Sequence, residues 1–350
     1  MITDLRLQNF RSYKDTSFEV DPGVNIIVGP NASGKTNLLE AVLVLARGGS
    51  YRAKDMDLVR HNQPWARLDA HLAEGGERTV KIVCEPSPSK ALEVLGKTYR
   101  RIGLAQTLPA ILFEPNHLLL LSGGPERRRD YLDDLLEQTV SGHGSLSRQY
   151  KRTLAQRNSL LKQPNTSTDQ LFPWDVRLSE LAGQIVRART QLVENLNSRL
   201  PKLYKALSGG KVKVSISYLS PWPADQYESR LLKKLEADHE LDRLRGFTGS
   251  GPHREDFALH FDEKLASEAA SRGEARTAIL ALKILELELI EAERNQKPIL
   301  LLDDVFSELD GKRRHALTDY LAPYQTFITT TDADLVVKNF TQKCKVIPLS

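Results

Sequence analysis

The sequence is poor in cysteine and aromatic residues and has no long apolar run. Its two cysteines, Cys84 and Cys344, lack the spacing of a metal site, and a reducing compartment is their simplest setting. The longest dense apolar stretch, residues 299–302, ends at two aspartates and is far shorter than a membrane span. The N-terminus alternates like a strand and lacks the layout of a signal peptide. These features predict a cytoplasmic protein without a membrane partner.

Neither sign of charge dominates the chain. The 49 Lys and Arg residues against 45 Asp and Glu residues give a net charge of +4, which permits nucleic-acid binding but does not demand it. Aromatic residues make up only 7% and are not interleaved with the basic clusters, so the sequence predicts no stacking platform for single strands. A length of 350 residues is long for one compact core, and we expect two lobes.

Residues 29–36 read GPNASGKT and fit the pattern G-x-x-x-x-G-K-[ST] of a phosphate-binding loop. A β-branched run at residues 24–28 precedes the loop, and residues 37–46 follow with the apolar spacing of a helix. The loop therefore joins a strand to a helix N-terminus, where unpaired N–H groups and the helix dipole attract phosphate. The alternative is a glycine-rich turn that feeds a core helix, and the flanking elements make it the rarer case.

The whole loop is a predicted nucleotide site, made of Gly29, Pro30, Asn31, Ala32, Ser33, Gly34, Lys35 and Thr36. We expect Lys35 at the β- and γ-phosphates of ATP and the Thr36 hydroxyl on Mg²⁺. Arg11 lies in a predicted turn, residues 9–13, that comes before the strand of the loop. It is a further candidate for the nucleotide, although a plain surface turn fits the sequence equally well.

Two aspartates follow the apolar run at residues 299–302. That run is typical of a buried parallel strand, and ligands of open α/β sheets bind at the carboxyl ends of such strands. We expect Asp303 to hold Mg²⁺ opposite Thr36, and Asp304 to orient or deprotonate the attacking water. The alternatives are an aspartate that caps a turn and a solvated carboxylate.

Ser271 and Gly273 stand at the start of a long predicted helix, residues 269–295. Ser271 and Glu274 have the spacing of a capping box, which satisfies N–H groups at a helix start. A helix start is also a site for anions. Local sequence favours the cap, and the two roles are compatible.

The middle of the chain reads as an antiparallel helical insert. Residues 126–136, 146–162 and 174–207 are predicted helices, the last interrupted at Pro201, whereas residues 2–10 read as an edge strand. Basic residues of the insert are candidate DNA contacts, namely Arg127, Arg128, Arg129, Lys151 and Arg152. The alternative is solvated helix faces, or pairing of the arginine run with nearby aspartates.

Stretches along nearly the whole chain resemble the RecF family of bacterial DNA-repair proteins, within the ABC and chromosome-structuring class of ATPases. They are NFRSY, GPNASGKTNLLEAV, FEPNHLLLLSGGPERRRDYLD, QRNSLLK, GSGPHRED, ARTAILALKILELELI and DDVFSELD, in this order. The resemblance implies an α/β fold, with an ABC-type P-loop ATPase head of mixed sheet and a mainly helical second lobe. We expect residues 1–110 and 294–350 in the ATP-binding lobe, and residues 111–293 in the lobe that carries the signature.

The same resemblance assigns roles at a dimer interface. Ser271 and Gly273 match the ABC signature, which in that class grips the γ-phosphate bound to a second subunit, and Ser307 and Asp310 match the D-loop. It implies ATP and Mg²⁺ as cofactors and an ATP-dependent homodimer. The implied partners are DNA (single-stranded, double-stranded or gapped), RecO and RecR. The implied activity is a weak DNA-dependent ATPase that helps to load recombinase at gaps.

The sequence departs from the general class at several positions. Ala270, Arg272 and Glu274 replace residues of the LSGGQ signature, and residues 329–332 stand where a switch histidine is expected. Asp304 takes the place of the usual catalytic glutamate, so we expect slow hydrolysis. Two other functions stay open, an ATP-gated DNA clamp that hardly needs hydrolysis and a transport-type ABC ATPase.

Overall fold

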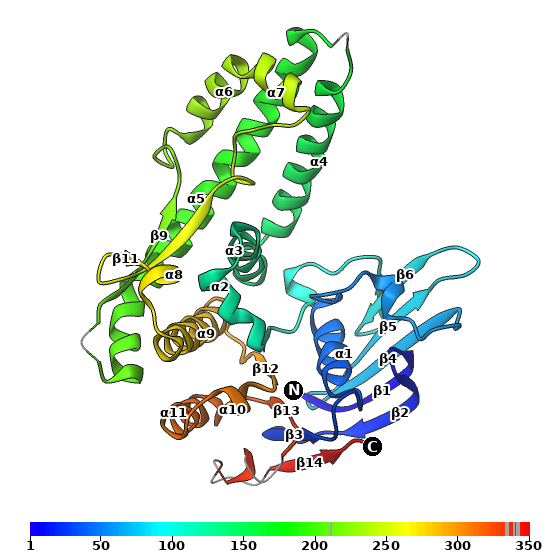
Figure 1. Ribbon diagram of the computed structural model, residues 1–350. Helices are drawn as coiled ribbons and strands as arrows, with labels where there is room; N and C mark the ends of the chain where they lie inside the picture. Colours follow the sequence, from blue (N-terminus) through cyan, green and yellow to red (C-terminus); the bar gives the residue numbers. More distant parts are fainter. Residues whose placement is uncertain (165, 211, 333–335, 339, 341–343) are drawn as a thin grey trace. The chain divides into compact units, whose positions relative to one another are not determined.

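The computed structural model describes residues 1–164, 166–210, 212–332, 336–338, 340 and 344–350 (Figure 1). The chain divides into two compact units: unit 1 comprises Met1–His117 and Glu286–Ser350, and unit 2 comprises Leu118–Leu285. The boundary expected after residue 110 falls inside β8 (Ala110–Phe113), which pairs with β12 (Ile299–Asp303) in unit 1. The second boundary lies within α9 (Arg272–Arg294).

A five-stranded sheet in unit 1 carries the phosphate-binding loop. Its order is β14-β3-β13-β12-β8, and every neighbouring pair is parallel. The remaining strands are β3 (Val24–Val28), β13 (Thr326–Thr330) and β14 (Lys345–Pro348). The four aliphatic residues of β12 are all buried, as expected for a parallel strand that is covered on both faces.

The second sheet of unit 1 is antiparallel, with the order β2-β1-β4-β5-β6-β7. Its strands are β1 (Ile2–Phe10), β2 (Tyr13–Glu19), β4 (Trp65–Leu72), β5 (Glu77–Val83), β6 (Ser89–Val94) and β7 (Lys97–Tyr99). The prediction of an edge strand at residues 2–10 was wrong, because β1 pairs with both β2 and β4. The sequence of β2 is mostly polar and therefore did not indicate a strand, although its Tyr13 and Phe18 are buried.

Helix α1 (Lys35–Arg47) contacts strands of both sheets (Figure 1). Nine consecutive residues of α1, 38–46, are buried, and only a helix that is covered on all sides buries such a run. This packing fixes the helix start, and hence the loop that precedes it. The other helices of unit 1 are η1 (Asp55–Leu58), η2 (Leu104–Gln106), α10 (Val305–Glu308) and α11 (Gly311–Leu321), and η3 (Pro115–Leu118) ends at the unit boundary.

Unit 2 is built on α5 (Thr168–Ser208), which packs against α4 (His143–Leu161) and α6 (Tyr227–Ala237) (Figure 1). Its 41 residues correspond to about 60 Å of helix. The predicted interruption at Pro201 was wrong, because the exposed Pro201 lies between the buried Leu200 and Tyr204, whose packing offsets the lost hydrogen bond. None of the described helices has the length and apolar character needed to cross a membrane.

The other elements of unit 2 are a small sheet and several shorter helices. A three-stranded antiparallel sheet has the order β11-β10-β9, and α3 packs on β10 as well as on α4 and α5. These elements are β9 (Val214–Leu219), β10 (Asp256–Phe261), β11 (Lys264–Leu265), α2 (Leu119–Ser122), α3 (Pro125–Thr139), α7 (His239–Arg245) and α8 (Ala266–Ala269).

Candidate functional site

In the loop between β3 and α1, neither of the two glycines has space for a side chain. A Cβ at Gly29 would lie 2.6 Å from the carbonyl oxygen of Leu349, and Gly34 has a φ of +99° with the Ser12 hydroxyl 2.8 Å from its Cβ position. Both positions therefore require glycine. Because α1 begins at Lys35, the N–H groups of its first turn have no acceptor within the helix and remain available to an anion.

Two side chains of the loop fit a phosphate ligand. The Lys35 ammonium lies over the loop, where it donates to the carbonyl oxygens of Gly29 at 2.7 Å and Pro30 at 2.8 Å. The Ser33 hydroxyl is buried, and within the described part of the chain it has no hydrogen-bond partner. The Lys35 ammonium and the Ser33 hydroxyl, which lie at a helix start, are both donors that can bind the oxygens of a phosphate.

Polar side chains from three elements meet beside the loop. The Thr36 hydroxyl contacts both carboxylate oxygens of Asp303, at 3.0 and 2.9 Å. Thr329, on the neighbouring β13, donates its hydroxyl to Asp303 at 2.7 Å and accepts the backbone N–H of Asp304 at 2.9 Å. The structure thus brings together the two residues predicted to hold Mg²⁺, and a hydroxyl and a carboxylate are ligands that Mg²⁺ prefers.

Asp304 follows Asp303 with a backbone φ of +53°, in the left-handed region that is uncommon for aspartate. It is exposed and precedes the short helix α10. The Thr329 contact holds its backbone in this conformation. Residue 329 lies in the segment where a switch histidine was expected, and the structure shows that its threonine orients both aspartates.

The fully buried carboxylate of Glu40 on α1 organises a second cluster in unit 1. Arg11 donates to its two oxygens at 2.9 and 3.1 Å and also to the carbonyl of Asp57, and Arg52 donates to it at 2.9 Å. Burial alone would raise the pKa of Glu40, but the hydrogen bonds from Arg52, Arg11 and Ser50 lower it to about 2. Arg11, predicted to reach the nucleotide, is thus paired with α1, and its contact with a nucleotide stays a prediction.

Replacing Glu40 by glutamine is expected to lower the free energy of unfolding at pH 7 by about 2 kcal/mol, less than for a fully buried pair, because both arginines are partly exposed. The folded-state pKa lies below the ordinary value of 4.5, so the carboxylate stabilises the fold above pH 4.5, and this contribution is lost as the pH falls towards 2. Denaturant unfolding at several pH values should show that the difference in unfolding free energy between wild type and variant decreases as the pH falls from 4.5 towards 2. A difference that is independent of pH would contradict this role of Glu40.

Ser271 and Glu274 form the predicted capping box at the start of α9. The Ser271 hydroxyl accepts the N–H of Glu274 at 3.3 Å, and a carboxylate oxygen of Glu274 accepts the N–H of Ser271 at 2.9 Å. Ser271 is exposed, and Gly273 lies in the first turn of α9. The cap is therefore confirmed, whereas the predicted contact of Ser271 and Gly273 with a second subunit stays a prediction.

Asp310, predicted as part of the D-loop, caps α11. Its carboxylate accepts the backbone N–H of Arg313 at 2.9 Å and also pairs with the Arg313 guanidinium, while the side chain remains about half exposed. Ser307 belongs to α10, and its side chain lies outside the described part of the structure. The contact of Ser307 and Asp310 with a second subunit therefore stays a prediction.

The three arginines at the start of α3 have different surroundings. Arg127 is exposed, whereas Arg128 donates to both oxygens of Asp256 at 2.7 Å and to the carbonyls of Leu120 and Gly123. Arg129 donates to the carbonyl of Glu255 at 2.9 Å. Arg128 thus fastens α3 to β10, and its donors are directed to the protein rather than to a phosphate.

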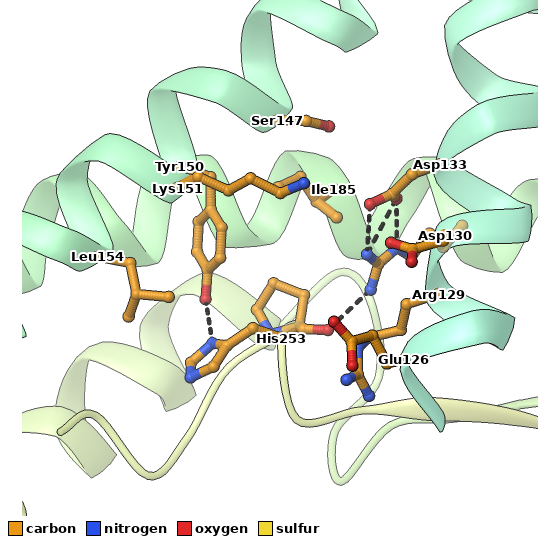
Figure 2. Close-up of a pocket in the computed structure, with 12 residues that line it drawn as sticks. Glu126, Arg129, Asp130, Asp133, Ser147, Tyr150, Lys151, Leu154, Ile185 and His253 are labelled. Carbon is orange, nitrogen blue, oxygen red and sulfur yellow. Dashed lines mark hydrogen bonds and ion pairs between the residues drawn. The ribbon is translucent and has the colours of Figure 1, made fainter. Parts of the chain in front are cut away.

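Arg129 and Lys151 face a pocket of about 300 Å³ in unit 2, which Glu126 and Asp130 also line (Figure 2). Carboxylates and cations are balanced there, so the pocket is no simple phosphate site. Lys151 and Arg152 on α4 are exposed. The exposed candidates are therefore Arg127, Lys151 and Arg152, and of these Lys151 also lines the pocket.

The family follows from comparison with known proteins. The family model described as RecF/RecN/SMC N terminal domain matches residues 1–348. The DNA replication and repair protein RecF of Acetivibrio thermocellus is 34% identical over 348 residues, with 95% of this chain and 94% of that protein covered. The chain belongs to the RecF family. RecF of Acidothermus cellulolyticus is 36% identical, with 95% of this chain and 94% of that protein covered.

Solved structures agree with this assignment. The structure of "the recombination mediator protein RecF-ATPrS in RecFOR pathway" matches with a TM-score of 0.89 at 31% identity, and covers 100% of this chain and 97% of that one. An Smc head bound to the C-terminal winged-helix domain of ScpA matches with a TM-score of 0.57 at 16% identity, covering 99% and 93%. The second likeness concerns the fold alone, that of an ABC-type ATPase head with α/β architecture.

Three functional side chains were missed in the sequence. Glu40 is an acid inside an otherwise apolar helical run, a signal that could have revealed it, because a buried carboxylate requires partners. Arg52 supplies one of these partners and also donates to Asn37 at 3.0 Å. Thr329 looked like one of three threonines in a buried strand, and only the pairing of β13 with β12 brings it to Asp303.

Proposed function

We propose that this RecF-family chain is an ATP-dependent DNA-binding protein of replication and repair, in which ATP joins two copies and slow hydrolysis releases them. The observation that carries the proposal is the meeting of Lys35, Thr36 and Asp303 beside a helix start. Family membership supports the repair function, because the relatives are named DNA replication and repair proteins.

Each residue of the nucleotide site has a role that its chemistry suggests. The loop N–H groups and Lys35 would bind the phosphates, and Thr36 with Asp303 would hold Mg²⁺. Bound ATP would supply a γ-phosphoryl group for transfer to water, and Mg²⁺ would offset the charge of that group. Asp304 would position that water and accept its proton, and Thr329 keeps Asp304 in place. A relative solved as RecF-ATP, 32% identical to this chain, supports ATP as the nucleotide.

Dimerisation is the second part of the proposal. Ser271 is exposed at the start of α9, a helix whose first N–H groups can receive an anion. In the ABC class, residues at this position grip the γ-phosphate of a second subunit. A γ-phosphate shared by two protomers stabilises the dimer, and hydrolysis removes the link. Asp310 and Ser307 would lie across the same interface.

DNA, RecO and RecR are the proposed partners. The name of the RecFOR pathway in the description of the matched structure supports RecO and RecR. Exposed basic residues of unit 2, Arg127, Lys151 and Arg152, are the proposed phosphate contacts. Their number is modest, so we expect DNA binding to depend on the two copies that ATP joins.

Fluorescence anisotropy with gapped duplex DNA tests this function, with ATP–Mg²⁺, ADP or no nucleotide. We expect tight binding only with ATP. Arg127→Ala should make the dependence of affinity on salt shallower by about 0.9 in log–log slope, with stability changed by less than about 0.5 kcal/mol.

Arg128→Ala is the matched comparison, since it removes the same charge one residue along α3. It should lower the free energy of unfolding by about 2–4 kcal/mol, because Asp256 loses its partner, and leave the salt slope of the folded protein unchanged. Equal effects of the two variants on the salt slope would contradict the division of roles. Binding that is independent of ATP would contradict the proposed function.

A further inference from the structure

Two motifs that the nucleotide site does not use meet in unit 2. The segment QRNSLLK ends α4, and GSGPHRED contains the end of the loop that joins α7 to β10. We call Gly246–Arg254 the 246–254 loop. Its Thr248 donates its backbone N–H at 2.8 Å and its hydroxyl at 2.7 Å to Asn158, and it accepts from the fully buried Arg157 at 2.8 Å. Residues of QRNSLLK therefore hold the 246–254 loop, which contains most of GSGPHRED.

Most polar members of GSGPHRED are bound to the protein. The Pro252 carbonyl accepts from the buried Arg189 at 2.8 Å, and the His253 ring contacts the Tyr150 hydroxyl at 2.6 Å, as Figure 2 shows. Glu255 accepts from Tyr218 at 2.7 Å, and Asp256 is paired with Arg128. These hydrogen bonds to buried and half-buried side chains make the loop rigid.

Arg254 is the exception in this motif. Its side chain is exposed, and within the described part of the chain no carboxylate pairs with it. Its guanidinium lies 4.7 Å from the centre of the Phe247 ring, an aromatic side chain that is itself 40% exposed. A rigid loop thus presents a guanidinium and a phenyl ring together to solvent, an arrangement that internal packing does not require.

Two more cations surround the same loop. Lys162 lies against Gly246, 3.7 Å from the Cβ position of that glycine, and a guanidinium nitrogen of Arg245 lies 3.0 Å from the Cβ position of Gly249. Both side chains are exposed, and no ion pair joins either of them to an acid of the described residues. Asp242, which contacts the loop, already has partners, because it accepts from Arg157 and from the N–H of Gly249.

We propose that Phe247 and Arg254, with Lys162 and Arg245 beside them, form a binding site for single-stranded nucleic acid. The cations match a phosphate backbone, and the exposed ring and guanidinium match the face of an unstacked base. An acidic protein segment would use the charges but not the ring. The site deepens the proposed DNA binding and rests on it. Phe247 and Arg254 lie outside the basic clusters in which the sequence showed no interleaved aromatic residue.

The test is fluorescence anisotropy of the full chain with ATP–Mg²⁺ over a series of salt concentrations. The probes are an oligothymidylate of about 20 nucleotides, longer than the site of a typical single-strand module, and an abasic strand of equal length. Arg254→Ala should weaken oligothymidylate binding about 5-fold or more and make the log–log salt slope shallower by about 0.7. Phe247→Ala should weaken binding by about 5-fold or more, with an unchanged slope and no effect on the abasic strand.

Two control variants are available. Phe247→Tyr keeps the aromatic face and should bind like wild type. Arg177→Ala removes the same charge as Arg254→Ala from unit 2, but Arg177 is paired with Glu180 and bonded to Gln149, so its loss should change neither affinity nor slope by as much as twofold. Because Phe247 and Arg254 are both exposed, we expect the thermal unfolding midpoints of all variants to stay close to that of wild type.

Photo-crosslinking of wild type to an iodouracil-substituted strand provides a readout that requires no variant, and the crosslinked peptide should contain Phe247. Wild type that binds DNA while Arg254→Ala and Phe247→Ala match Arg177→Ala would overturn this inference alone, and would favour an acidic protein segment as the occupant. If Phe247→Ala lowered the affinity for the thymidylate strand and for the abasic strand equally, the stacking contact would be overturned. Wild type that binds no DNA under any condition would overturn the proposed function as well.

Discussion

Lys35→Ala is expected to weaken ATP binding by about 100-fold, because two charge-assisted hydrogen bonds to phosphate are lost. The fold should be unaffected, since among the described residues the Lys35 ammonium donates to carbonyl oxygens of its own loop alone. Titration calorimetry with ATP–Mg²⁺ measures the effect. Lys14→Ala, which removes an exposed lysine of β2, is the matched control and should bind ATP like wild type. An affinity of Lys35→Ala equal to that of the control would contradict the role of the loop.

Asp304→Asn is expected to slow ATP hydrolysis by about 100-fold and to change ATP affinity by less than about twofold, as for the loss of a general base. Asparagine keeps the size and the left-handed backbone conformation of residue 304 but accepts no proton. Single-turnover hydrolysis and equilibrium binding measure the two effects separately. Asp319→Asn, an exposed change on α11, should alter neither.

The same variant separates the proposed function from an ATP-gated clamp. If hydrolysis releases the protein, Asp304→Asn should stay on DNA in ATP while wild type dissociates. If the protein works as a clamp that does not need hydrolysis, the two should dissociate at the same rate. Hydrolysis by the variant at the wild-type rate would instead show that Asp304 is not the base.

The proposed nucleotide site was largely predictable because its parts are local in the sequence. A strand, a glycine-rich loop and a helix follow one another within residues 24–47, and each has a pattern that does not depend on the rest of the chain. Asp303 was predictable for a similar reason, since an acid that ends a buried aliphatic strand is itself a local signal. Its 2.9 Å contact with Thr36, from far away in the sequence, confirms the prediction that the two residues lie together.

The features that were missed depend on pairing between distant segments. β1 looked like an edge strand because β2, its partner, has a polar sequence. The boundary expected after residue 110 cuts through β8, because only the pairing of β8 with β12 places the whole strand in unit 1. Arg128 looked like its neighbours in an arginine run, but Asp256, its partner, lies 128 positions along the chain. No local pattern contains such partners.

Light scattering of the purified protein tests the central claim, that ATP joins two copies through Ser271. We expect the molar mass of wild type to double with ATP–Mg²⁺, but not with ADP or without nucleotide. Ser271→Arg should remain monomeric in ATP, because a long cation replaces the hydroxyl at the start of α9. Glu274→Ala also weakens the capping box, at a cost of about 1 kcal/mol, yet should still dimerise. A wild type that binds ATP and stays monomeric, with DNA present as well as without it, would contradict the account.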